Sequence, residues 1–216
     1  MHNPFSYVYK LVANNLGLPL KPSMLTYIVT FKCNARCLMC DSWKKTHEGE
    51  LDAGQIDAML AKLPRMDMVR LSGGEPFVRG DIGEIVASVG TRLRPSLIHI
   101  TTNGLLGDRI VSLVENRDRR IPLFLLVSID GMKDKHNSVR GLRDAWEKVN
   151  ETLRRLAPLR KKFNFHISVN QTVVDADGLE QYLRLNDHLC PYDINNNLVI
   201  AYDESATYSA SSGGGY

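Results

Sequence analysis

Six short β-rich segments alternate with segments of helical period along most of the chain, and this alternation limits the possible folds more than any other feature. Strands that alternate with helices form parallel sheets covered by helices, because each connection returns to the same end of the sheet. The sequence therefore predicts an α/β fold, either an open doubly wound sheet or an incomplete barrel. The predicted strands are 25–31, 68–71, 97–101, 123–129, 165–174 and 198–201, and the predicted helices are 51–63, 81–93, 108–116, 143–156 and 179–189.

Composition places the chain among ordinary globular proteins. It has 216 residues, of which 44% are hydrophobic, and a formal net charge of +3. No apolar run approaches the roughly 18 residues of a membrane span, and the first five residues, Met1–Phe5, do not resemble the start of a secretory signal. We therefore expect a cytoplasmic protein without a membrane span. The mild charge indicates no nucleic-acid partner.

Three regions differ in pattern. Residues 1–22 have a loose helical stripe and are predicted to form a leader helix, and residues 23–203 carry the alternation and form the core domain. Residues 204–216 are of low complexity and are predicted to be disordered. Because no helical pattern follows the last predicted strand, we expect either a naturally short chain or a fragment truncated at its C-terminus.

A cluster of cysteines follows the first predicted strand. Cys33, Cys37 and Cys40 have the spacing C-x3-C-x2-C, which allows one loop to wrap a soft metal site. A [4Fe–4S] cluster held by three thiolates keeps one iron open for a ligand. The alternative is a structural zinc site, with His47 or Cys190 as the fourth ligand.

Other polar and glycine-rich segments also stand at predicted strand ends, where parallel α/β folds bind ligands. Each has a plainer interpretation as a turn, a cap or a surface residue. Glu75 is a candidate acceptor for a ligand ammonium, Arg140 a candidate clamp for a carboxylate, and the amides at 170 and 171 candidates for ribose hydroxyls. The full set of candidates is Gly73, Gly74, Glu75, Pro76, Ser128, Asp130, Arg140, Asn170 and Gln171.

These motifs in this order resemble the radical S-adenosylmethionine superfamily. The resemblance rests on the C-x3-C-x2-C loop, on Gly-Gly-Glu-Pro at 73–76, on Ser128-x-Asp130-Gly131, and on Thr-Thr-Asn-Gly at 101–104. It covers about residues 24–201, and it is similar to the molybdenum-cofactor and peptide-modifying branch. Met39 stands where many members have an aromatic residue. We expect no cysteine-rich C-terminal extension within this chain, because only Cys190 follows the cluster motif.

The resemblance implies a partial (β/α)6 barrel with a [4Fe–4S] cluster on Cys33, Cys37 and Cys40, and S-adenosylmethionine bound at the open iron. Residues 73–76 would meet the methionine ammonium, Ser128 and Arg140 its carboxylate, and Asn170 or Gln171 the ribose. The implied reaction is reductive cleavage of S-adenosylmethionine to a 5′-deoxyadenosyl radical, which takes a hydrogen atom from substrate. No catalytic residue is implied beyond the cluster and the cofactor.

The implied partners are a flavodoxin-like or ferredoxin-like one-electron reductant and a substrate, either a peptide or a small molecule. Two alternative functions compete with the enzyme. One is a truncated, non-catalytic iron–sulfur module for binding or electron transfer, and the other is a structural zinc domain.

Overall fold

A computed structural model describes residues 8, 12–13, 15–17, 22–45, 48–173 and 175–200. Its centre is one six-stranded sheet in which every neighbouring pair of strands is parallel. The strands follow one another in chain order across the sheet, whereas a doubly wound sheet reverses its strand order. The strands are β1 (Met24–Thr30), β2 (Met68–Gly73), β3 (Leu97–Thr102), β4 (Leu123–Ser128), β5 (Phe165–Val173) and β6 (Asn195–Ile200).

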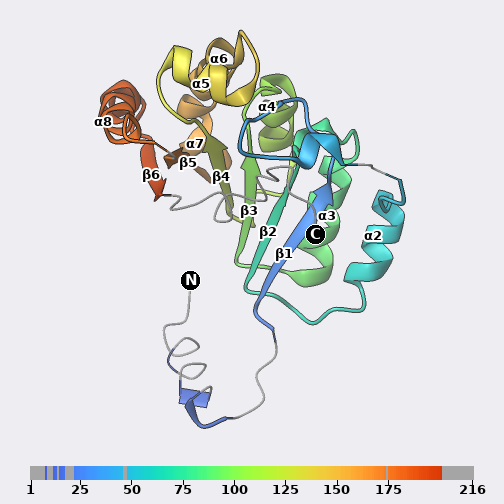
Figure 1. Ribbon diagram of the computed structural model, residues 1–216. Helices are drawn as coiled ribbons and strands as arrows, with labels where there is room; N and C mark the ends of the chain where they lie inside the picture. Colours follow the sequence, from blue (N-terminus) through green and yellow to red (C-terminus); the bar gives the residue numbers. More distant parts are fainter. Residues whose placement is uncertain are drawn as a thin grey trace.

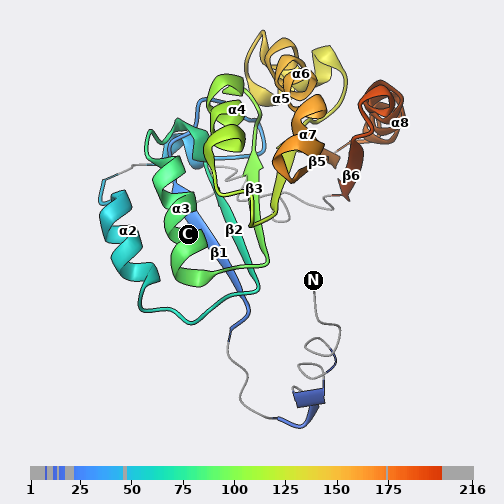
Figure 2. The same cartoon turned by 180° about the vertical axis from the view of Figure 1, so that it is seen from behind.

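The helices run between the strands and cover one face of the sheet. Figures 1 and 2, seen from opposite sides, show α3 and α4 behind and then in front of the first strands. Within the described residues, β1 pairs only with β2 and β6 pairs only with β5. The two edge strands do not meet, so the sheet does not close into a full barrel. The prediction of a partial barrel is confirmed. The α-helices are α2 (Ala53–Leu60), α3 (Ile82–Leu93), α4 (Gly107–Asn116), α5 (Lys133–Arg140), α6 (Ala145–Leu156), α7 (Arg160–Phe163) and α8 (Gly178–Leu189); the 3-10 turns are η1 (Ser42–Lys44), η2 (Pro76–Val78), η3 (Ala157–Leu159) and η4 (Cys190–Tyr192).

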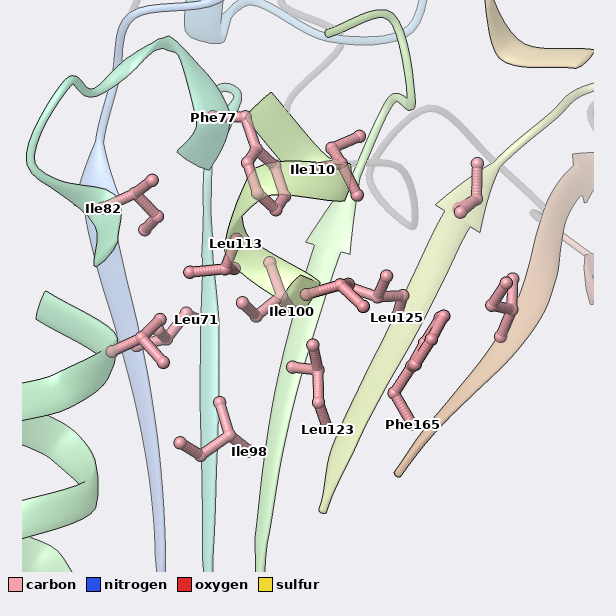
Figure 3. Close-up of a cluster of buried hydrophobic side chains, with 14 of the residues drawn as sticks. Leu71, Phe77, Ile82, Ile98, Ile100, Ile110, Leu113, Leu123, Leu125 and Phe165 are labelled. Carbon is pink, nitrogen blue, oxygen red and sulfur yellow. The ribbon is translucent and has the colours of Figure 1, made fainter. Parts of the chain in front are cut away.

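The two faces of the sheet differ in chemistry. Alternate residues of the strands, such as Leu71, Ile100 and Leu125, are fully buried against the helices (Figure 3). The opposite face carries half-buried and largely polar side chains, among them Arg70, Ser72, Thr101, Ser128 and Asn170. A packed core therefore supports a polar concave side, which is where the ligand candidates stand.

Helix α5 was not predicted from the sequence. Its buried residues are His136, Val139 and Arg140, two of which are polar, so the helix has no apolar stripe to detect. Strand β6 also begins at Asn195, three residues before the predicted start. The predicted leader and tail lie largely outside the described residues.

Candidate functional site

The cysteine loop begins directly after β1, at the carboxyl end of the sheet. Cys33, Cys37 and Cys40 all belong to one small apolar cluster whose buried members also include Leu105 and Ala145. Cys37 is buried, and the other two thiols are half-buried. The loop therefore places its three cysteines in one apolar environment.

Each sulfur atom has a polar neighbour. Arg140 Nη1 lies 3.5 Å from Cys37 Sγ, and Ser42 Oγ lies 3.4 Å from Cys40 Sγ. Cys33 Sγ accepts from the main-chain N–H of Ala35 at 3.5 Å. Burial raises the pKa of Cys33 to about 11 and also raises the pKa of Cys37, so these thiols must lose protons when they bind a metal.

Gly73 and Gly74 bring the end of β2 against the cysteine loop. The main-chain N–H of Gly74 donates to Thr30 O and that of Glu75 to Lys32 O, each at 2.8 Å. A Cβ on Gly74 would overlap the carbonyl oxygens of Phe31 and Lys32. The close approach that these glycines permit is therefore to the backbone of the cysteine loop.

The Glu75 carboxylate, a predicted acceptor for a ligand ammonium, has three donors within the protein. Glu75 is fully buried, and its carboxylate accepts from Thr102 Oγ1 at 2.8 Å, from the N–H of Asn103 at 2.6 Å and from the N–H of Phe77 at 3.1 Å. Burial raises its pKa to about 7, against the effect of these donors. Glu75 ties the end of β2 to the end of β3, and the buried Pro76 begins η2 behind it.

Asp130 and Arg140 form a buried ion pair beside the loop. Arg140 Nε lies 2.8 Å from Asp130 Oδ2, and the Asp130 N–H donates to His136 Nδ1 at 3.2 Å. Two main-chain bonds also join the end of α5 to the cysteine loop, from Arg36 N–H to Arg140 O and from Leu38 N–H to Val139 O. The guanidinium predicted to clamp a ligand carboxylate is thus engaged by Asp130 and faces Cys37.

Of the two candidate amides, only Asn170 lies on the polar face of the sheet. It is the register partner of Ser128 on β4, and both side chains are half-buried. Gln171 faces the helices, is fully buried, donates to Gly178 O at 3.4 Å and accepts from Asn196 Nδ2 at 3.1 Å. Gln171 is thus engaged within the protein on the helix side of the sheet, whereas Ser128 and Asn170 stand together on the polar face as a candidate pair.

Asn103 is a residue of the site that is not among the candidates predicted from the sequence. Its side chain donates to Asn34 Oδ1 at 2.8 Å, and its Nδ2 lies 3.9 Å from Cys33 Sγ. Because its own N–H binds Glu75, it connects the Gly-Gly-Glu-Pro segment to the cysteine loop. Its place at the end of the strand next to β2 was the signal that could have revealed this role.

The donor set fits an iron–sulfur cluster, whose usual ligands are cysteine thiolates tuned by hydrogen bonds to sulfur. Within the described ranges, no three His, Cys, Asp or Glu side chains come close enough to hold a single metal ion. Cys190, a candidate fourth ligand for zinc, is exposed at the start of η4. His47 lies outside the described residues.

Residues 27–185 match the family described as the Radical SAM superfamily. The chain belongs to the radical SAM superfamily. Its curated relatives include the GTP 3',8-cyclase of Clostridium perfringens (strain 13 / Type A), 32% identical over 180 residues, which are 79% of this chain and 53% of that protein. The Fe-coproporphyrin III synthase of Methanosarcina barkeri is 26% identical over 165 residues, 74% of this chain and 40% of that protein.

The fold of this radical SAM protein is also found among solved structures. SuiB of Streptococcus suis, bound to S-adenosylmethionine, superposes with a TM-score of 0.70 at 15% identity, covering 96% of this chain and 48% of SuiB. The chain thus spans about half the length of SuiB and of the cyclase that it matches. None of the described helices is both long and apolar enough to cross a membrane.

Proposed function

We propose that the protein is a radical SAM enzyme that cleaves S-adenosylmethionine reductively and uses it to abstract hydrogen from a substrate. The observation that carries the proposal is the set of three cysteines gathered in one loop, with a polar group next to each sulfur atom. The names of the two relatives above refer to different substrates, a nucleotide and a porphyrin. The proposal therefore covers the radical SAM reaction and names no substrate.

Cys33, Cys37 and Cys40 would hold a [4Fe–4S] cluster, and the carboxyl ends of β2, β4 and β5 would hold S-adenosylmethionine. When bound, these groups supply one-electron cleavage of the cofactor's carbon–sulfur bond, with an external reductant giving the electron and methionine and 5′-deoxyadenosine as products.

The chain's own residues build and orient the site. Gly74 and Glu75 hold the start of the cysteine loop through main-chain bonds, and the end of α5 holds its middle. Ser128 and Asn170 offer a hydroxyl and an amide side by side on the polar face, which suits the carboxylate or ribose of the cofactor. The buried core behind β2–β5 keeps these groups in fixed geometry, as hydrogen abstraction requires.

The test is anaerobic reconstitution with iron and sulfide, followed by reduction in the presence of S-adenosylmethionine. We expect about four irons per chain, an EPR signal that changes when S-adenosylmethionine is added, and formation of 5′-deoxyadenosine. Cys37→Ala should abolish product formation, whereas Cys190→Ala, at an exposed position outside the loop, should keep it.

Each contrary outcome points to a different function. A cluster that ignores S-adenosylmethionine would favour a non-catalytic iron–sulfur module. Zinc without iron or sulfide would replace the proposal with a structural zinc domain.

A further inference from the structure

The Asp130–Arg140 ion pair places a buried charge beside one cysteine of the loop. The Asp130 side chain is 2% exposed and the Arg140 side chain 10%. Two different nitrogen atoms of the guanidinium contact the two neighbours. Nε lies 2.8 Å from Asp130 Oδ2, and Nη1 lies 3.5 Å from Cys37 Sγ. Arg140 therefore lies between the carboxylate and the sulfur atom.

Holding the loop in place does not by itself require this pair. The main-chain bonds from Arg36 and Leu38 already attach the loop to the end of α5. A buried ion pair is also a poor stabiliser compared with apolar packing, because both charges must leave water. Its position against a metal-ligand candidate points instead to an electrostatic effect on the sulfur.

The three cysteines differ in the charge of their partners. In the described part of the chain, Cys33 Sγ has the Asn103 amide at 3.9 Å and Cys40 Sγ has the Ser42 hydroxyl at 3.4 Å, both neutral groups. Only Cys37 Sγ has a cation within hydrogen-bonding distance.

We propose that Arg140 is a positioning residue that raises the reduction potential of a cluster held by Cys37, and that Asp130 moderates this effect. The inference rests on the proposed function, because it needs the cluster to be present. A reduced cluster carries one more negative charge, so a cationic donor at a ligand sulfur favours the reduced form. Asp130, on the far side of the guanidinium, partly cancels the positive charge.

The test is a redox titration of the reconstituted full chain followed by EPR, without S-adenosylmethionine. Arg140→Gln should lower the midpoint potential, with about a tenfold smaller ratio of reduced to oxidised cluster at a fixed ambient potential, which is 59 mV for one electron. Asp130→Asn should shift the midpoint upward, because the guanidinium is then no longer compensated. Opposite shifts from two members of one ion pair are not expected from a shared loss of structure.

Two further variants serve as controls. Arg140→Lys keeps the positive charge and should stay nearer to the wild-type midpoint than Arg140→Gln. Ser42→Ala removes the neutral neighbour of Cys40 and should shift the midpoint less than Arg140→Gln. Iron content is measured for every variant. If Arg140→Gln does not take up iron, Asp130→Asn decides, and a midpoint equal to that of the wild type overturns the inference.

The outcomes separate this inference from the proposed function. A wild-type protein without a cluster contradicts the proposed function itself. A wild-type cluster whose midpoint is the same in Arg140→Gln contradicts only the inference. A variant with an unchanged midpoint but weaker binding of S-adenosylmethionine would return Arg140 to the role of a carboxylate clamp.

Discussion

At the scale of single residues, Gly74 shows how one missing Cβ sets the position of the cysteine loop. An alanine there would overlap the carbonyl oxygens of Phe31 and Lys32, which are main-chain atoms and cannot rotate away. We expect Gly74→Ala to lower the free energy of unfolding of the cluster-free protein by about 1–3 kcal/mol. Cluster uptake should fall as well, because the loop must shift to make room.

Gly83 on α3 provides the matched control. A Cβ at this helical position would meet no atom within 4 Å. Gly83→Ala should leave cluster uptake unchanged and stabilise the protein by up to about 1 kcal/mol. Urea unfolding and iron analysis of both variants test the argument. Equal effects of the two substitutions would show that the contact between β2 and the loop is unimportant.

At the scale of elements, Glu75 joins the ends of β2 and β3, and its burial makes this connection sensitive to pH. Its folded-state pKa of about 7 lies above the ordinary value of 4.5, so its contribution to stability is full below pH 4.5 and is lost as the pH rises through about 7. Relative to Glu75→Gln, the wild type should therefore lose stability between pH 5 and pH 8, by up to roughly 3 kcal/mol.

The measurement is urea unfolding of both proteins at each pH, with Glu84→Gln on the exposed start of α3 as the surface control. Other groups, such as His136, whose pKa burial lowers to about 3, act equally in wild type and variant and cancel in the difference. A difference that does not vary with pH would mean that Glu75 stays ionised inside the protein.

Sequence patterns predict elements well where the buried side of each element is apolar. All six strands and the helices with apolar stripes are found near their predicted bounds. Helix α5 was not predicted because two of its buried positions hold the polar residues His136 and Arg140. Their partners come together only in the folded chain. The cysteine motif was likewise readable, since its spacing is local. The burial of the Glu75 carboxylate depends on contacts with the neighbouring strand β3. The orientation of the Gln171 side chain toward the helices depends on strand register. No local sequence pattern encodes either of these.

At the scale of the whole molecule, the larger of the two apolar clusters joins elements from β1 to α8. It includes Val29 at one edge of the sheet, Leu125 at its centre and Leu189 on α8. A core shared by all layers predicts one cooperative unfolding transition. Far-UV circular dichroism and tryptophan fluorescence should therefore give the same midpoint, because Trp43 follows the cysteine loop and Trp146 stands on α6.

Leu125→Ala tests the reach of this core. Leu125 is fully buried, so its truncation leaves a cavity and should cost about 2–5 kcal/mol. Both probes should move together, since the loss is shared by the whole cooperative unit. Val199→Ala on β6, where the side chain is 43% exposed, should change stability by no more than about 0.5 kcal/mol. If fluorescence and circular dichroism separate in Leu125→Ala, the cysteine loop and the sheet unfold as distinct units, and the core does not hold the site in place.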